Sequence, residues 1–354
     1  MEEPGPSPFK LRRAIVAVKI VRQPKNIALL GAPTSAAALA AGHERAPGAL
    51  RAAGLVARLE AAGFDVTDHG DCATRVFQPD DEHPRARNAT EVLATLEELR
   101  PKVEMAIKSG ALPVILGGDN SILLAAIAAA RRYYRNVGLI FLDRDASLNE
   151  PATTSSGSVD GMVISHVIGR GAPELVRFWG EPPLVRGPQV TLFGVERLND
   201  LDQQFLQRST LRRYLAEDVV RMGVPAAAGQ ALDGVHGRAS EFVLHLDLGL
   251  IAGEDFSATN LSAAGGLRLG EVRQALSIFA AQPTLAAFVV SAYNPELDPD
   301  GTAAKRVIDL LVEVLATRLE MGANPPAGDD ATASSPASPG DSPAAAQESD
   351  RSAT

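Results

Sequence analysis

The chain has 354 residues, of which 45% are hydrophobic and 22% charged, and its formal net charge is −9 at pH 7. This length and composition suit one large α/β domain or two smaller ones. The acidic balance argues against a protein that binds nucleic acid or an anionic membrane. A single cysteine, Cys72, excludes an intramolecular disulfide. No run of about eighteen apolar residues and no secretion signal occur, so we expect a soluble, cytoplasmic protein.

The predicted elements follow an N-terminal arm at residues 1–25. Short apolar runs bounded by polar or Gly-rich residues predict strands, and longer runs with helical spacing predict helices. Strands are expected at residues 26–33, 64–66, 112–116, 137–142, 189–195, 241–247 and 285–290, and helices at 47–62, 88–109, 122–133, 162–168, 200–216, 225–238, 269–280 and 302–320.

Strands and helices thus alternate along most of the chain, which is typical of a mostly parallel sheet with helices on both faces. No internal repeat and no linker interrupts residues 26–321, so we expect one domain there. Residues 322–354 are rich in Pro, Ser, Ala and Asp without an apolar period, and we predict that they form a disordered tail.

The most informative stretch is the strand predicted at 137–142, which runs directly into Asp143, Arg144 and Asp145. Acidic side chains at the carboxyl end of a buried strand point into the crevice where open α/β sheets place their sites. Alternation puts Asp143 and Asp145 on one face, where they repel each other unless a cation or a raised pKa relieves the repulsion. The alternative is a solvated strand end with a helix cap.

Several motifs occur in a characteristic order, and together they resemble the ureohydrolase (arginase/agmatinase) family over about residues 27–318. They are Gly31 to Pro33, Gly117-Gly118-Asp119, Asp143 with Asn149, residues 153–157, Asp247 and Gly265-Gly266. The resemblance implies a three-layer α/β/α sandwich on an eight-stranded, mostly parallel sheet. It also implies two bridged manganese ions, a hydroxide that attacks a guanidinium carbon to release urea, and a homo-oligomer, trimeric or hexameric.

The ligand positions of that family are largely changed in this chain. Only Asp143 and Asp247 keep the residue type of the family, and none of the histidines stands at a ligand position. Asp143, Asp145 and Asp247, with a weak carbonyl from Asn120, could hold one hard cation, so we expect one manganese ion at most. The six positions fall on Asn120, Asp143, Asp145, Ser147, Asp247 and Gly249.

Other residues of the resemblance concern catalysis and the substrate. Asp160 stands at the position of a catalytic-loop histidine, and it is either a general base or a cap of the following helix. Asn149, Ser156 and Ser158 stand where the family binds the carboxylate and amine of an amino acid. The alternative is that this Ser/Thr loop satisfies its own backbone.

Two further residues could modify the site. Arg144, where the family has alanine, could supply the positive charge that a metal otherwise brings and make the site metal-free. His245 lies two residues before Asp247 on the same strand face, so it is either a ligand or a buried core residue.

Two functions therefore stay open. One is a divergent metal-dependent hydrolase of a guanidino or amidino C–N bond. The other is a catalytically inactive family member that binds a small guanidino or amino-acid-like ligand or acts as a regulatory subunit. Efficient binuclear arginase activity is not expected in either case.

Overall fold

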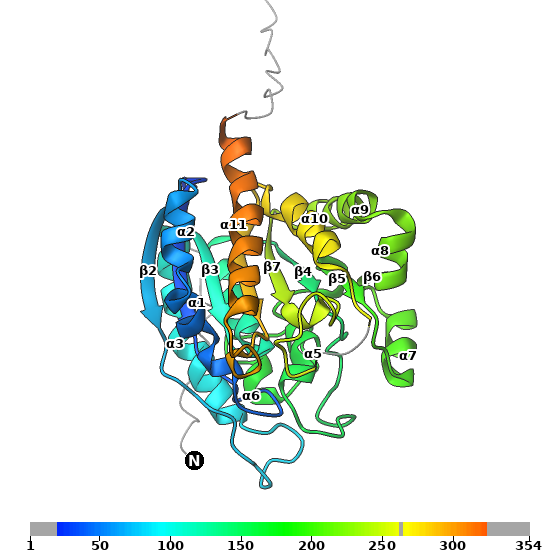
Figure 1. The fold of residues 1–354 in the computed structure, drawn as a ribbon. Helices are drawn as coiled ribbons and strands as arrows, with labels where there is room; N and C mark the ends of the chain where they lie inside the picture. Colours follow the sequence, from blue (N-terminus) through cyan, green and yellow to red (C-terminus); the bar gives the residue numbers. More distant parts are fainter. Residues whose placement is uncertain (1–19, 262–264, 324–354) are drawn as a thin grey trace, which may run out of the picture.

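The computed structural model describes residues 20–261 and 265–323, and its centre is a parallel sheet of eight strands (Figure 1). The strands lie in the order β2-β1-β3-β8-β7-β4-β5-β6, and each neighbouring pair is parallel. They comprise β1 (Asn26–Ala32), β2 (Asp65–Asp71), β3 (Leu112–Gly117), β4 (Val137–Leu142), β5 (Val190–Val195), β6 (Arg212–Leu215), β7 (Glu241–Asp247) and β8 (Leu285–Ser291).

Helices cover both faces of the sheet, which confirms the expected three-layer α/β/α sandwich. One face packs against α1, α2 and α8 to α11, and the other against α3 to α7. The helices are α1 (Ala46–Ala52), α2 (Leu55–Ala61), α3 (Ala89–Lys108), α4 (Leu123–Tyr133), α5 (Val163–Val167), α6 (Pro173–Val176), α7 (Asp200–Arg208), α8 (Ala216–Met222), α9 (Val224–His236), α10 (Leu269–Ala280) and α11 (Thr302–Ala323).

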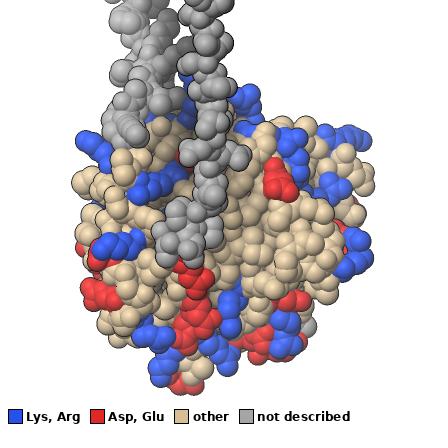
Figure 2. Space-filling model, turned by 90° about the horizontal axis from the view of Figure 1, so that it is seen from above, with Lys and Arg blue, Asp and Glu red and all other residues tan. Residues whose placement is uncertain are grey.

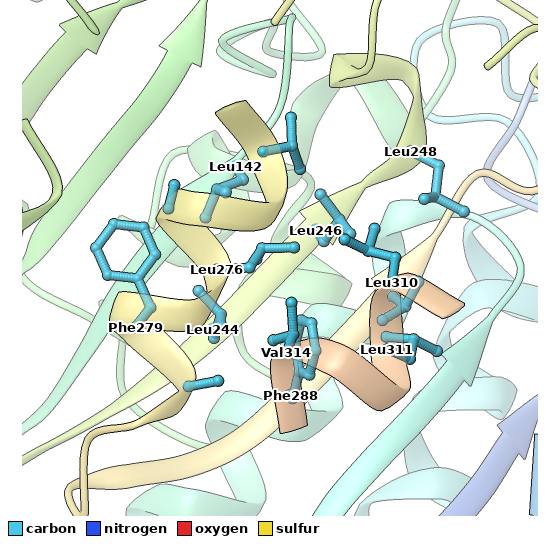
Figure 3. Packing of buried hydrophobic residues seen from close by; sticks show 14 of the residues in the cluster. Leu142, Leu244, Leu246, Leu248, Leu276, Phe279, Phe288, Leu310, Leu311 and Val314 are labelled. Carbon is cyan, nitrogen blue, oxygen red and sulfur yellow. The ribbon is translucent and has the colours of Figure 1, made fainter. Parts of the chain in front are cut away.

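The central strands are buried on both sides, so their side chains alternate between two hydrophobic cores. In Figure 3, Leu244 and Leu246 of β7 lie in the core that also holds Phe279 of α10 and Val314 of α11. Val243, which directly precedes Leu244 on β7, belongs to the opposite core. The continuous apolar runs in the sequence therefore mark strands with no solvent-facing side.

The helix predicted over residues 200–216 is wrong. α7 ends at Arg208, and residues Arg212–Leu215 form β6, which pairs with β5 at the edge of the sheet. The segment is only half-buried, so it lacks the continuous apolar run that reveals the inner strands. Pairing with β5 overrides its local pattern.

The helix predicted over residues 47–62 is also divided. Gly54 has φ 95°, in the left-handed region that glycine adopts without strain, and it separates α1 from α2. The break lets both short helices pack on the same core.

The edge of the sheet opposite β6 is β2, and its side chains are mostly exposed. Asp65, Asp68 and Asp71 lie on this strand. Arg51 of α1 forms ion pairs with Asp68, at 2.7 Å, and with Asp71, so α1 is tied to the outer strand.

Charges of both signs are scattered over the face of the molecule seen in Figure 2. Exposed pairs such as Arg58 and Asp309, 2.8 Å apart, bring opposite charges together. Both signs therefore occur among the described residues of the face in view.

The predicted arm and tail lie largely outside the described residues. Residues 20–25 form neither helix nor strand, and α11 continues to Ala323, slightly beyond the expected domain boundary. Within the described ranges, every helix is too short or too polar to cross a membrane.

His166 of α5 anchors the segment that follows β4. Its ring is fully buried, Nδ1 lies 2.8 Å from the carbonyl oxygen of Met162, and the N–H of Ala172 donates to Nε2 at 3.1 Å. The proton of the neutral ring therefore sits on Nδ1. Burial lowers the pKa of His166 from 6.5 to about 4.

This shift predicts acid sensitivity. Above about pH 6.5 the ring is neutral in both the folded and the unfolded chain. Below that pH the ring binds a proton in the unfolded chain but stays neutral in the folded chain. We expect a contribution of about 3 kcal/mol to the free energy of unfolding to be lost as the pH falls from 6.5 toward 4.

The measurement is the melting temperature of wild type and of His166→Gln between pH 4 and pH 8. Wild type should lose stability relative to the variant as the pH falls. His236→Gln is the control, because His236 contacts Thr284 in an exposed setting. Parallel profiles for wild type and His166→Gln would contradict the prediction.

Candidate functional site

The candidate site is a cavity of about 700 Å³ at the carboxyl ends of the central strands. β4 and β7 are parallel neighbours, with Leu142 paired to Leu246, so the aspartates that follow each strand emerge side by side. The structure brings all the predicted site residues to the wall of this cavity: Asn120, Asp143, Asp145, Asn149, Ser156, Ser158, Asp160 and Asp247.

Asn120 joins the two deepest carboxylates. It lies in a short 3-10 turn (Asn120–Ile122) after β3, and its Nδ2 donates to Asp247 Oδ2 at 2.7 Å and to Asp143 Oδ2 at 3.4 Å. Its Oδ1 accepts a hydrogen bond from Ser291 Oγ at the end of β8. Because the oxygen is committed to Ser291, the amide presents N–H groups to the carboxylates.

His245 is a core residue, the second of the two alternatives that the sequence left open. Its ring stacks on Phe141 with centroids 4.6 Å apart, and Nε2 lies 3.0 Å from Ser291 Oγ. Burial lowers the pKa of His245 to about 3, so the ring is neutral. Since Ser291 donates to Asn120, His245 donates to Ser291 and thereby fixes the orientation of the amide.

Asp143 and Asp247 are both buried close to each other. Burial, and then the neighbouring Asp247 and Asp145 carboxylates, raise the pKa of Asp143 well above its usual range. Burial raises the pKa of Asp247 to about 6, although hydrogen bonds from Asn120 and Gly249 oppose the shift. The pair therefore shares protons, or it requires a positive partner in addition to the amide.

Asp145 is paired with an arginine that the sequence did not single out. Arg197 Nη1 lies 3.1 Å from Asp145 Oδ2. Arg144, the predicted counter-charge, instead forms its ion pair with Glu196. Burial raises the pKa of Asp145, while Arg197 and then Arg144 lower it. The direct contact with Asp145 thus belongs to Arg197, while Arg144 lowers the pKa of Asp145 through its charge, and the predicted role of Arg144 as the counter-charge of the site stays a prediction.

Asp160 does not cap the helix that follows it. It is the first residue of a 3-10 turn (Asp160–Met162), and its Oδ1 accepts the backbone N–H of Asn120 at 2.7 Å. Burial, and then Asp119, raise the pKa of Asp160 well above its usual range. Its carboxyl group therefore restrains the backbone of Asn120, and its predicted role as a general base stays a prediction.

The three residues predicted to bind the substrate, Asn149, Ser156 and Ser158, differ in their hydrogen bonds. Ser158 Oγ donates to the carbonyl oxygen of Ala37 at 2.8 Å, and Ser156 Oγ accepts the N–H of Ser158 at 3.2 Å. These hydroxyls satisfy nearby backbone groups, as the alternative expectation stated. The side-chain amide of Asn149 makes no hydrogen bond within the described part of the chain, and Asn149 lines the cavity, so this amide is available there.

The donor atoms around Asp143 and Asp247 decide whether this cavity can hold manganese. Among the described residues, no group of His, Cys, Asp or Glu has an arrangement that would hold a metal ion. The amide N–H groups of Asn120 occupy the approach to Asp143 and Asp247, and Asp145 faces Arg197. An amide N–H cannot act as a metal ligand.

Ser147 and Gly249, at the other two ligand positions of the family, provide no strong metal ligand. Ser147 has φ 49°, and its Oγ lies 3.5 Å from Asp143 Oδ2. Gly249 has no side chain, and its backbone N–H donates to Asp247 Oδ1 at 2.6 Å. A single hard cation bound between Asp143 and Asp247 would have to displace the Asn120 N–H group from these carboxylates.

Sequence reasoning missed several residues of the cavity wall. Arg197, Asn199 and Asp202 follow β5, the neighbour of β4, and a polar sequence after that strand was the available signal. His43 lies in a 3-10 turn before α1, far from the motifs in sequence. It is buried, neither ring nitrogen has a partner among the described residues, and burial lowers its pKa to about 4.

Comparisons with known proteins agree on one family. Residues 25–316 match the model of the arginase family. Arginase from Brevibacillus brevis is 28% identical over 295 residues, which is 83% of this chain and 99% of that protein. Arginase from Bacillus cereus has a TM-score of 0.74 at 27% identity, covering 82% of this chain and 98% of that chain.

More distant structures share the fold. A formiminoglutamase from Trypanosoma cruzi, solved with manganese, has a TM-score of 0.65 at 18% identity and covers 83% of this chain and 93% of its own. The family match, the full-length similarity to bacterial arginases and the motif order confirm the resemblance seen in the sequence. The chain belongs to the arginase family.

Proposed function

We propose that this family member binds a small cationic ligand, an amine or a guanidinium compound, in the acidic cavity and does not carry out binuclear manganese hydrolysis. The observation that carries the proposal is the contact of the Asn120 amide with Asp247, at 2.7 Å, and with Asp143, at 3.4 Å. The amide holds together two carboxylates that would otherwise need a cation between them.

The charge of the cavity favours a cation. Asp145, Asp160 and Asp202 line it together with the buried pair, whereas Arg197 is the one arginine among the described residues of its wall. A guanidinium group can donate paired hydrogen bonds to a carboxylate. A volume of about 700 Å³ is suited to a ligand of amino-acid size.

The end of the ligand that lies away from the aspartates would meet the predicted substrate residues Asn149, Ser156 and Ser158. Asn149 is the best placed of the three predicted contacts, because its amide has no other partner in the described ranges. Ser156 and Ser158 hold the loop in shape through their bonds within it and to Ala37. An amino-acid-like ligand with a carboxylate or an amine at that end is therefore part of the proposal.

A second candidate is a hydrolase that uses one manganese ion. Asp143, Asp145 and Asp247 all line the cavity, and the pKa of each is raised, a shift that a bound cation would reverse. Asp160 would then serve as the general base. This function would require Asn120 to give up its bond to Ser291 and turn its oxygen toward the ion.

The ligand is tested by calorimetry with arginine, agmatine and citrulline, the neutral counterpart of arginine. We expect the two cationic compounds to bind and citrulline to bind at least about tenfold more weakly, because charged hydrogen bonds are lost. Asp247→Asn should weaken the binding of both cations. Asp81→Asn is the control, since Asp81 is exposed and lies outside the cavity. Equal affinity for arginine and citrulline would overturn the cationic-ligand proposal.

Metal content is measured by elemental analysis after loading with manganese and desalting. We expect at most one ion per chain and no urea release from arginine. One ion together with urea release would favour the second candidate. Two ions, or manganese-dependent urea release at rates typical of the family, would contradict both.

Assembly and location are inferred from the family resemblance. A homo-oligomer, trimeric or hexameric, in the cytoplasm is the expectation. Sedimentation velocity of the purified chain decides the assembly, and a monomer at micromolar concentration would contradict it.

A further inference from the structure

A second cavity, of about 200 Å³, opens at the amino-terminal ends of β4 and β5. Its lining comes from two segments, the turn from α4 into β4 and the segment that leads into β5: Arg131, Arg135, Asn136, Val137, Glu181, Pro182, Pro183, Leu184, Arg186 and Gln189. β4 has six residues, so at about 3.3 Å per residue the two cavities lie about 20 Å apart, at opposite ends of the same strands. They share no lining residue.

Three arginines meet in this second cavity. Arg131 lies in the last turn of α4, Arg135 in the turn that follows, and Arg186 in the segment before β5. Arg131 is partly buried, and its Nη1 donates to the carbonyl oxygen of Pro183 at 3.1 Å. That bond fixes one guanidinium group against the wall, while Arg135 and Arg186 are more exposed.

These arginines lack acidic partners within the described ranges. None of the ion pairs there includes Arg131, Arg135 or Arg186. Glu181 is the one acidic residue of the lining, and it forms no ion pair with them. Burial, and then the like charge of Arg186, lower the pKa of Arg131, so the two guanidinium groups are close enough to repel each other.

We propose that this cavity binds a small oxyanion, namely a phosphate group, either free or carried by a small ester. Three guanidinium groups against one carboxylate leave an excess of positive charge that matches a dianion. Each guanidinium offers planar, paired N–H donors that fit phosphate oxygens, and the amide of Asn136 lies in the same wall. The proposal is independent of the ligand in the acidic cavity.

Phosphate fits better than a single carboxylate. One arginine fork satisfies a planar carboxylate, whereas a tetrahedral phosphate presents oxygens in several directions and can accept from more than one arginine. The cavity volume of about 200 Å³ is several times the roughly 30 Å³ that a water molecule occupies. It therefore has room for a phosphate group and part of the group that carries it.

The test uses the full chain and inorganic phosphate, with sodium chloride adjusted to keep the ionic strength constant. Calorimetry and thermal shift are measured for wild type, Arg186→Ala, Arg186→Lys and Arg131→Ala/Arg186→Ala. Arg208→Ala is the matched control, because Arg208 is an exposed arginine of α7 outside both cavities.

We expect wild type and Arg208→Ala to bind phosphate equally, and Arg186→Ala to bind about tenfold more weakly. Arg186→Lys should retain part of the affinity, and the double variant should lose the thermal shift. A small phosphate ester, glycerol 3-phosphate, is the second arm. Tighter binding than that of phosphate identifies an ester as the ligand, and weaker binding identifies the free ion.

Unchanged affinity in Arg186→Ala would overturn the proposal, and so would an equal thermal shift with acetate or with chloride alone. Arg131→Ala removes the bond to Pro183 and can affect folding. Arg186 is exposed and makes no such bond, so the single variant decides the outcome if the double variant does not fold.

Discussion

Replacing Asn120 by aspartate is expected to lower the melting temperature by about 10 °C and to make the stability of the chain depend on a divalent cation. The side chains have the same shape, but the variant loses the donor that bonds to Asp247 and Asp143. Three carboxylates then face one another in a buried site. An uncompensated buried charge costs about 3–5 kcal/mol, which corresponds to about 10 °C for a domain of this size.

The measurement is thermal unfolding of wild type and Asn120→Asp with and without manganese. We expect added manganese to restore much of the stability of the variant and to change wild type little. Gln207→Glu is the control, because it makes the same amide-to-carboxylate change at an exposed residue of α7 outside both cavities. If Asn120→Asp has the melting temperature of wild type and manganese does not change it, the amide is not what holds the two carboxylates together.

Gly118→Ala is expected to destabilise the fold by about 3 kcal/mol or more. A Cβ at this position would lie 1.9 Å from the carbonyl oxygen of Thr34. That carbonyl is fixed, since it accepts the N–H of Asp119 at 3.0 Å, so the backbone cannot move aside without breaking the bond. Overpacking against a backbone atom is among the costlier core changes.

Gly229→Ala is the matched control. Gly229 lies inside α9, and a Cβ there would meet nothing within 4 Å. Alanine should stabilise this helix by about 0.5–1 kcal/mol. Urea unfolding gives the free energies of both variants, and the prediction is refuted if the two changes have effects of the same sign and size.

The sequence predicted those parts of the fold whose residues are buried on every side. β4, β7 and β8 were recognised because each is a short run of mostly apolar residues. β6 was not, because an edge strand has one exposed side and its pattern is set by pairing with β5 rather than by burial. The division at Gly54 follows from a positive φ that spacing alone does not reveal.

The sequence predicted several of the residues that line the cavity, but it did not predict their hydrogen-bond and ion-pair partners. The motif order located Asn120, Asp143 and Asp247, since it reflects where parallel strands end. The ion pair of Asp145 with Arg197 joins loops after two different strands, and the orientation of Asn120 depends on Ser291. Such contacts come from tertiary packing, and neither composition nor spacing contains them.

The outer strand β2 has a consequence for how copies of this chain can meet. It carries Asp65, Asp68 and Asp71 along an edge whose side chains are mostly exposed. Asp65 pairs with Lys25, and Asp68 and Asp71 pair with Arg51, so a strand added at this edge would have to bury or break charged pairs, which discourages strand-to-strand addition. The sheet therefore stops at this edge, which disfavours fibre-like growth of the chain through β2.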